Sequence, residues 1–282
     1  MVAIKPEWHS SLVLQKHEFL WIKDYLYKET GIALNDNKQA LISGRLEKRL
    51  RHYGFSSYSE YFHLLGKPQF EHETLMAIDL LTTNETYFFR EPQHFDFLTT
   101  HFLRTHPPSQ PLRFWSAASS SGEEAYTLAL TVSQFSKFSQ WEIIGTDIST
   151  RMLEKARQGL YTMSAADKIP SPLLKQYCLK GRDEYEGFFL INSTLRRRVK
   201  FMYANLNDEL PKLGLFNVIF LRNVMIYFDM PTKQRLIDRI QHHLRPGGYF
   251  IISHSESLNG INSKLQMVSP SIYQKHEPPV VS

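Results

Sequence analysis

The sequence predicts an α/β protein: a doubly wound, Rossmann-like sheet domain with a small antiparallel β insertion, preceded by a small all-helical domain. Strand-like and helix-like segments alternate after residue 109, as is typical of a parallel sheet. Before residue 82 the apolar residues recur only at helical spacing. We therefore expect a helical domain over residues 1–81, a connecting segment over 82–108 and the sheet domain over 109–282.

Apolar spacing and stop signals define the helical domain. Leu12, Phe19, Ile22 and Leu26 recur at helical spacing until Thr30-Gly31, where the glycine predicts a helix end. Three further helices are expected: one from Asn35-Asp36 to Gly54, one opened by the capping sequence Ser57-Tyr58-Ser59-Glu60, and one over 70–81.

The sheet domain is predicted from buried-strand patterns that are followed by helical ones. The expected strands are 112–118, 141–148, 199–204, 216–221 and 249–253, and the expected helices are 123–135, 150–158 and 231–243. Between residues 160 and 198 the alternation breaks. A helical segment there includes Cys178, and the stretch 185–192 beside Gly181 and Gly187 predicts the antiparallel insertion.

Composition limits the function classes. No apolar run approaches the roughly 20 residues that cross a bilayer, and the N-terminus lacks the apolar core of a signal peptide. The single cysteine, Cys178, rules out an intrachain disulfide and fits a reducing cytoplasm. We predict a cytoplasmic monomer without membrane insertion.

The chain is basic, with a net charge of +5 and a pI near 9.1, which suggests an acidic partner. No basic run is interleaved with stacking aromatics, so we predict no nucleic-acid binding. The run Arg196-Arg197-Arg198 is interpreted as the solvated start of a strand. The 12 histidines are scattered, and His242, His243 and His254 are interpreted as surface or packing residues, so no metal site is predicted.

A ligand site is expected where the first strand ends. The loop Ser119-Ser120-Ser121-Gly122 has one glycine, whereas a dinucleotide site favours Gly-x-Gly-x-x-Gly. Glu123 and Glu124 follow directly and would repel pyrophosphate. They suit a ligand with positive charge, such as the sulfonium and amino group of S-adenosylmethionine, or alternatively only complement the helix dipole.

Asp147 ends the second strand, where an acidic residue accepts hydrogen bonds from both ribose hydroxyls of a nucleotide ligand. Capping of the next helix is the alternative role, but Ser149 is the better cap. We therefore predict that Asp147 binds ribose, a feature that NAD enzymes share.

Two motifs resemble the chemotaxis receptor methyltransferases, which transfer methyl groups from S-adenosylmethionine to glutamates on bacterial chemoreceptors. They are Thr82-Thr-Asn-Glu-Thr-Tyr-Phe-Phe-Arg-Glu-Pro92 and Arg222-Asn-Val-Met-Ile-Tyr-Phe-Asp229. The resemblance extends over residues 12–275. It includes Ser121-Gly-Glu-Glu-Ala-Tyr-Thr127, where Ala125 replaces the family's proline and removes a rigid residue from the first helical turn.

The resemblance implies the cofactor S-adenosylmethionine, the product S-adenosylhomocysteine, and a set of site residues. The implied cofactor contacts are Asn84, Thr86, Arg90, Glu124, Asp147, Asn205, Leu206, Arg222 and Asn223. Arg90 and Tyr227 are expected to align the reacting groups, Arg90 by holding a carboxylate and Tyr227 by a hydrogen bond or a cation–π contact. Without the resemblance, Asn205 would be interpreted as a turn residue, Arg90 as a surface residue and Tyr227 as a core aromatic.

Substrate recognition is expected in the helical domain. Lys38, Arg45 and Arg49 fall within a narrow stripe of the second helix, which we call the basic ridge. A solvated charged face is the alternative, whereas the resemblance implies contact with the receptor's acidic methylation helix. The resemblance also implies that the β insertion can bind a receptor C-terminal peptide by β-augmentation.

Three rival functions stay open on the sequence. A methyltransferase for RNA or a small molecule would share the cofactor site without needing the basic helical domain. A non-catalytic receptor-binding or cofactor-sensing module would keep the fold, and an NAD oxidoreductase is disfavoured by the glycine-poor loop.

Overall fold

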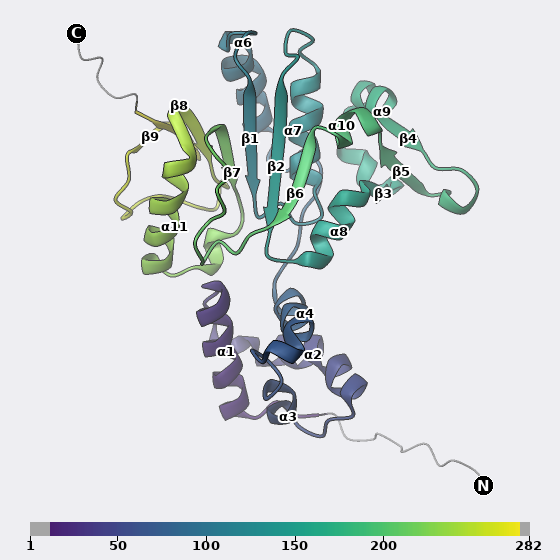
Figure 1. Cartoon of the computed structure of the whole chain (residues 1–282), viewed down its shortest axis with the longest axis vertical. Coiled ribbons are helices and arrows are strands. Elements are labelled where there is room, and N and C mark those ends of the chain that lie inside the picture. Colours follow the sequence, from purple (N-terminus) through teal and green to yellow (C-terminus); the bar gives the residue numbers. More distant parts are fainter. Residues whose placement is uncertain (1–11, 277–282) are drawn as a thin grey trace. The chain divides into compact units, whose positions relative to one another are not determined.

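The computed structural model describes residues 12–276 and divides the chain into two compact units, the first ending at Thr83 and the second beginning at Asn84 (Figure 1). The predicted fold class is confirmed: the first unit is helical, and the second contains a mostly parallel sheet and a small antiparallel one. Among residues 12–276, no helix combines the length and apolar character that a membrane crossing requires.

Over residues 12–83, the first unit contains four α-helices and two short turns. These are α1 (Lys16–Thr30), α2 (Gln39–Tyr53), α3 (Tyr58–Phe62) and α4 (Glu71–Leu81), with 3₁₀ turns at Asp36–Lys38 and Pro68–Phe70. Gly31 and Gly54 end α1 and α2 with φ of 78° and 71°, as their stop signals predicted. Ser57 caps α3 by accepting the Glu60 N–H at 3.2 Å, but the Glu60 carboxylate accepts from Ser56 N–H instead of completing the box.

Two residues of the basic ridge have partners inside this unit. The Arg45 guanidinium donates to the carbonyls of Leu81 and Thr82, both at 3.0 Å. Arg49 holds Glu73 with two hydrogen bonds, one of them from Nε to Oε1 at 2.8 Å. Burial acts to raise the pKa of Glu73, but Arg49 and Tyr61 together hold it below its ordinary value. Lys38 is exposed, and receptor binding by the ridge stays a prediction.

The second unit contains a seven-stranded sheet in the order β6-β2-β1-β7-β8-β10-β9. Its strands are β1 (Leu112–Ala117), β2 (Trp141–Asp147), β6 (Val199–Tyr203), β7 (Phe216–Leu221), β8 (Leu244–Ile251), β9 (Leu265–Ser269) and β10 (Ile272–Lys275). The first five strands in this order are parallel, so their carboxyl ends meet at one edge, whereas β10 pairs antiparallel with both β8 and β9. The sheet order reverses between β1 and β7, which is where ligands bind in doubly wound folds.

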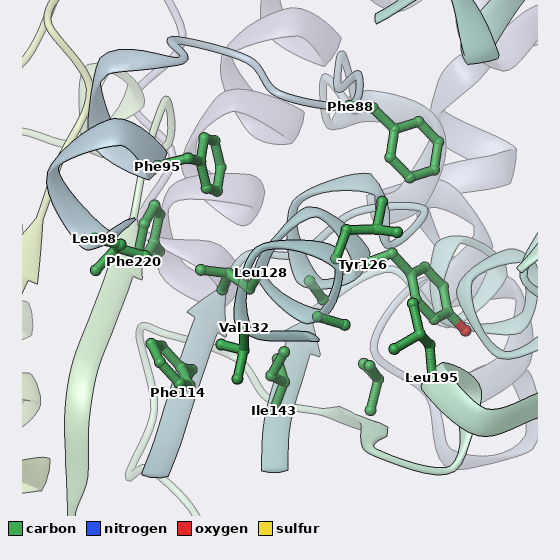
Figure 2. Close-up of a cluster of buried hydrophobic side chains, with 14 of the residues drawn as sticks. Phe88, Phe95, Leu98, Phe114, Tyr126, Leu128, Val132, Ile143, Leu195 and Phe220 are labelled. Carbon is green, nitrogen blue, oxygen red and sulfur yellow. The ribbon is translucent and has the colours of Figure 1, made fainter. Parts of the chain in front are cut away.

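Helices cover the sheet and exclude water from it. They are α5 (Gln93–Phe97), a π-helical turn (Leu98–Phe102), α6 (Leu103–Thr105), α7 (Glu123–Ser133), α8 (Thr150–Gln158), α10 (Ser193–Arg196) and α11 (Met230–His243). Figure 2 shows Phe114 and Ile143 of neighbouring strands beneath Leu128 and Val132 of α7, with Phe95 beside Phe220. The stacked Phe95 and Phe220 rings lie 5.5 Å apart and join α5 to β7.

The antiparallel insertion lies between α8 and β6. Its strands, in the order β3-β5-β4, are β3 (Leu160–Thr162), β4 (Cys178–Lys180) and β5 (Phe188–Ile191), and α9 (Ser171–Tyr177) precedes β4. Gly181 begins the β4–β5 loop, where a Cβ atom would lie 2.0 Å from the Tyr185 carbonyl oxygen. This close approach explains why glycine stands there.

Three sequence interpretations were wrong or incomplete. Cys178 begins strand β4 and is not helical, and burial raises the pKa of its thiol to about 12. The helical stretch 93–105 was not predicted. Its residues Phe95 and Phe102 belong to the core of the sheet domain, and this packing is not visible in the local sequence. Strands β9 and β10 were also not predicted, since β9 is exposed at the sheet edge and has no buried-strand pattern.

We expect Arg49→Ala to destabilise the helical unit, because it leaves the Glu73 carboxylate buried without its cation. Breaking a buried ion pair costs about 3–5 kcal/mol, and the low end applies because the Arg49 side chain is 23% exposed. Thermal unfolding followed by circular dichroism should show an early transition, about 10 °C or more below that of the wild type. Lys38→Ala is the matched control and should unfold like the wild type. Equal unfolding of both variants would show that the Arg49–Glu73 pair contributes little.

Candidate active site

Polar residues converge where β1, β2 and β7 end. The loop Ser119–Gly122 follows β1, Asp147 ends β2, and Arg222 and Asn223 follow β7. The segment 84–92 lies against them, because the Ser120 hydroxyl donates to the Asn84 carbonyl at 3.1 Å and Arg222 donates to the Arg90 carbonyl at 2.5 Å. Residues far apart in the chain therefore form one polar site.

Asp147 ties the first strand's loop to the second strand. Its carboxylate accepts the N–H of Ser120 at 2.8 Å and the N–H of Ser149 at 2.9 Å, and the residue is only 6% exposed. Ser149 caps α8, accepting the Met152 N–H at 3.0 Å, as predicted. Each carboxylate oxygen has a second lone pair, so these bonds are compatible with further donors such as ribose hydroxyls.

Gly122 lets the loop after β1 pass close to its neighbours. It has φ of 96°, and a Cβ atom would lie 2.9 Å from that of Ala156 and 3.0 Å from the Phe201 ring. Any other residue here would be strained by the positive φ and would force one of these neighbours to shift.

Arg222 is the central cation of the site. Its side chain is 1% exposed and lies 3.0 Å from Glu124 and 3.3 Å from Glu91. Glu124 also accepts from the Ser116 hydroxyl at 2.7 Å. Burial raises the pKa of Glu124 despite this arginine. Burial also acts to raise the pKa of Glu91, but the charge of Arg222 and hydrogen bonds from Ser253 and His254 hold it below its ordinary value.

The glutamates after Gly122 therefore meet partners from the chain itself. Glu124 faces Arg222, and Glu123 accepts from the Ser121 hydroxyl at 2.7 Å. Neither the ligand interpretation nor the helix-dipole interpretation of these two carboxylates included such internal partners. A contact between Glu124 and the cofactor stays a prediction. Such a contact would involve a carboxylate that is already paired with Arg222.

Left-handed backbone conformations are concentrated in this site. Phe89, Glu91, Ala118, Ser120 and Asn223 have φ between 48° and 64°. Such conformations are costly for residues with a Cβ atom and persist where the surroundings enforce them, commonly at functional sites.

Arg90 and Tyr227 are both half-buried at this edge. Arg90 donates to the Glu85 carbonyl at 2.7 Å, and its guanidinium lies 5.5 Å from the centre of the Tyr87 ring. Tyr227 lies on the 3₁₀ turn Met225–Tyr227, directly after Arg222–Val224. Thr86 is half-buried in the same segment as Arg90.

Asn205 forms the turn that its alternative interpretation predicted. Its Oδ1 accepts the Asn207 N–H at 3.0 Å and its Nδ2 donates to Asp208 at 2.9 Å. The Leu206 carbonyl accepts from Arg239 of α11 at 2.5 Å. Contact of Asn205 and Leu206 with an adenine edge stays a prediction.

Four residues of the site were missed by sequence reasoning: Glu91, His94, His254 and Glu256. Glu256 accepts backbone N–H groups of Asn223 and Ser253 at 3.1 and 2.9 Å and so fixes the turn before Tyr227. The available signals were the position of Glu91 inside the Arg90 motif and of His254-Ser-Glu256 after a parallel strand.

Glu91, His94 and His254 could together hold a metal ion, since one ligand atom of each lies within 4.8 Å of the others. His94 is fully buried, neither ring nitrogen has a hydrogen-bond partner, and burial and the charge of Arg222 lower its pKa to about 3. Arg222 works against a metal, because its charge is 3.3 Å from the one carboxylate of this cluster.

The doubly wound sheet, the one-glycine loop and the acidic residue ending β2 fit an S-adenosylmethionine-dependent methyltransferase, and the family match shows that class. Residues 84–273 match the family described as CheR methyltransferase, SAM binding domain, and residues 17–82 match CheR methyltransferase, all-alpha domain. This chain belongs to the CheR methyltransferase family.

Named relatives resemble the chain over most of its length. It is 38% identical over 262 residues to chemotaxis protein methyltransferase 2 of Pseudomonas aeruginosa, covering 92% of each chain. It is 33% identical over 284 residues to the chemotaxis protein methyltransferase of Salmonella typhimurium, and 34% identical over 284 residues to that of Escherichia coli. Both alignments cover 97% of this chain and 98% of the relative.

The site residues fit S-adenosylmethionine. Ser119 Oγ and Arg222 Nε are buried without a hydrogen-bond partner, and Gly122 allows a close backbone approach. An amino acid and a ribose offer the polar groups that such atoms would bind, and Asp147 offers an acceptor for hydroxyls.

We expect Asp147→Ala to weaken binding of S-adenosylmethionine and S-adenosylhomocysteine alike, because both contain the ribose. The loss should be on the order of 2–3 kcal/mol for a pair of charge-assisted hydrogen bonds. Calorimetry measures both affinities. Glu142→Ala, on the same strand, is the control and should bind like the wild type. Unchanged affinity of a folded Asp147→Ala protein would remove Asp147 from the binding site.

Proposed function

We propose that this chain methylates glutamate side chains of bacterial chemoreceptors in the cytoplasm, using S-adenosylmethionine and releasing S-adenosylhomocysteine. The observation that carries the proposal is the convergence of the Arg90 segment with Asp147 and Arg222 at the strand ends. Family membership supports the methyltransferase chemistry, and the net charge of +5 suits an acidic protein substrate.

The reaction needs alignment more than acid–base chemistry. The cofactor supplies an electrophilic methyl group, so that an O–C bond forms as the C–S bond breaks and the electron pair stays on sulfur. A glutamate carboxylate, with an ordinary pKa of about 4.3, is already ionised at neutral pH. No general base is required, and the protein contributes by orienting the carboxylate and excluding water.

Arg90 and Tyr227 are proposed to orient that carboxylate. The planar guanidinium of Arg90 can donate two parallel hydrogen bonds to a carboxylate. The Tyr227 hydroxyl can donate a third, from the turn that Glu256 holds in place by accepting the Asn223 N–H. Both residues would hold the acceptor oxygen still.

The helical unit is proposed to meet the receptor's methylation helices. Lys38 is exposed, and Lys48 and Arg51 are further exposed cations on α2. Arg45 and Arg49 contribute indirectly, by fixing α2 against α4. A substrate that is RNA or a small molecule would make this basic surface dispensable.

Transfer of labelled methyl groups from S-adenosylmethionine to purified chemoreceptors, with base-labile release as methanol, tests the proposal. We expect receptor labelling with the wild-type protein. Tyr227→Phe removes one hydroxyl and should lower kcat more than the affinity for S-adenosylhomocysteine, because its hydrogen bond matters when the acceptor is aligned.

Two results would contradict these expectations. Absence of base-labile label on any receptor, with cofactor binding intact, would favour another substrate or a non-catalytic module. Wild-type kcat for Tyr227→Phe at saturating receptor would make Tyr227 a packing residue.

We further propose a monomer whose β insertion binds a receptor C-terminal peptide. β4 is an edge strand of its sheet, and Leu179 and Tyr185 beside the edge are 57% and 50% exposed. The Gly181 N–H donates across to Phe188, so by alternation the Lys180 N–H points away from β5, toward an added strand.

Calorimetric titration with a synthetic peptide copying a receptor C-terminus tests this partner. Lys180→Pro removes one outward N–H at a position where an edge strand tolerates proline, and should weaken binding about tenfold. Lys180→Ala is the control and should bind like the wild type. If the wild type does not bind the peptide, or if Lys180→Pro and Lys180→Ala bind it equally, β-augmentation at β4 is wrong. Light scattering measures the molar mass in solution, which should be that of one chain.

A further inference from the structure

Arg90 is flanked by two backbone positions in the left-handed region. Phe89 and Glu91 both have φ of 54°, and neither is glycine. The Phe89 N–H donates to the Thr127 hydroxyl at 3.1 Å, and its ring lies 5.6 Å from that of Phe95. These contacts hold the backbone at residue 89, before Arg90. The left-handed conformation at residue 91, after Arg90, must be held by the contacts of Glu91.

The Glu91 side chain is bound by two separate strand ends. Oε2 lies 3.3 Å from the Arg222 guanidinium, after β7, and accepts the His254 N–H at 3.1 Å, after β8. Oε1 accepts the Ser253 hydroxyl at 2.9 Å. The same arginine donates to the Arg90 carbonyl, so Arg222 holds both the backbone before Glu91 and its side chain.

Arg222 lies between two carboxylates, 3.3 Å from that of Glu91 and 3.0 Å from that of Glu124. Burial raises the pKa of Glu124, whereas Arg222 and its hydrogen bonds hold the pKa of Glu91 low. The other titratable groups that face Glu91 are His94, at 3.6 Å, and His254. His94 stays neutral, because burial lowers its pKa to about 3.

We propose that Glu91 is a positioning residue for methyl transfer. By binding Arg222, Ser253 and His254 it keeps residue 91 in the left-handed conformation, and this aims the neighbouring Arg90 side chain at the carboxylate to be methylated. The proposal rests on the proposed function of Arg90. Glu91 itself touches neither cofactor nor substrate in this scheme, so its loss affects the orientation of Arg90 more than cofactor affinity.

Glu91→Gln tests the proposal, because it preserves the shape of the side chain but removes the charge that Arg222 binds. It also places an amide NH₂ group against the donors of Arg222, Ser253 or His254. We expect kcat for receptor methylation to fall at least about tenfold, while the Kd for S-adenosylhomocysteine changes less than about threefold. Glu142→Gln is the matched control. It removes a carboxylate paired with Arg113 at 2.7 Å and Lys200 at 3.0 Å, at the opposite end of β2, and should keep wild-type kcat.

A crystal structure of Glu91→Gln gives a second readout that does not depend on activity. We expect residue 91 to leave the left-handed region and the Arg90 guanidinium to move. An unmoved Arg90 overturns the proposal, as does wild-type kcat. A loss of S-adenosylhomocysteine affinity that equals the loss of kcat also overturns it, because Glu91 would then act through the cofactor.

Failure of the proposed function looks different from failure of this inference. A wild-type protein that labels no receptor refutes the receptor substrate, whereas the position of Arg90 in Glu91→Gln still decides the role of Glu91. Addition of Zn²⁺ to wild-type protein tests a third possibility, in which Glu91, His94 and His254 bind a metal ion. Stoichiometric Zn²⁺ binding that His94→Phe abolishes would make Glu91 a metal ligand and overturn the positioning role.

Discussion

The buried charge of Arg222 is the constraint on which the rest of the site depends. A guanidinium with a 1% exposed side chain has to be matched by acceptors, and it is matched by Glu124, Glu91 and the Arg90 carbonyl. These acceptors come from α7 and from the segment before α5. One cation after β7 therefore sets where two other segments lie.

The parallel sheet makes this arrangement possible. Because β2, β1, β7 and β8 run in one direction, the residues after each of them reach the same edge. Backbone N–H groups, hydroxyls and carboxylates that follow different strands then form hydrogen bonds with one another. Asp147, for example, accepts the N–H groups of Ser120 and Ser149. A cofactor that binds there meets atoms whose positions are already fixed, which lowers the cost of ordering them.

Local signals predicted much of the fold and part of the site. Gly31, Gly54 and Ser149 each act within a few residues of their helix, and the sequence shows such effects directly. The place of Asp147 at the end of β2 was predicted from the strand pattern, whereas its binding of ribose stays a prediction. The partner of Arg49 in the basic ridge was not predicted, since Glu73 lies 24 residues from Arg49 and no local pattern shows that they meet. Glu91 and His94 were missed for the same reason, as Glu91 binds groups that follow β7 and β8 and the His94 ring contacts that of His254.

The long-range nature of the Arg222 contacts has a consequence for folding. Its partners Glu124 and Arg90 lie 98 and 132 residues earlier, and Glu91 meets Ser253 across 162 residues. A partly assembled sheet would bury one of these charges without its counterpart, at a cost of several kcal/mol. Intermediates of that kind are thus scarcely populated, so the second unit assembles cooperatively, and slowly, because contacts so distant in the chain are the last to close.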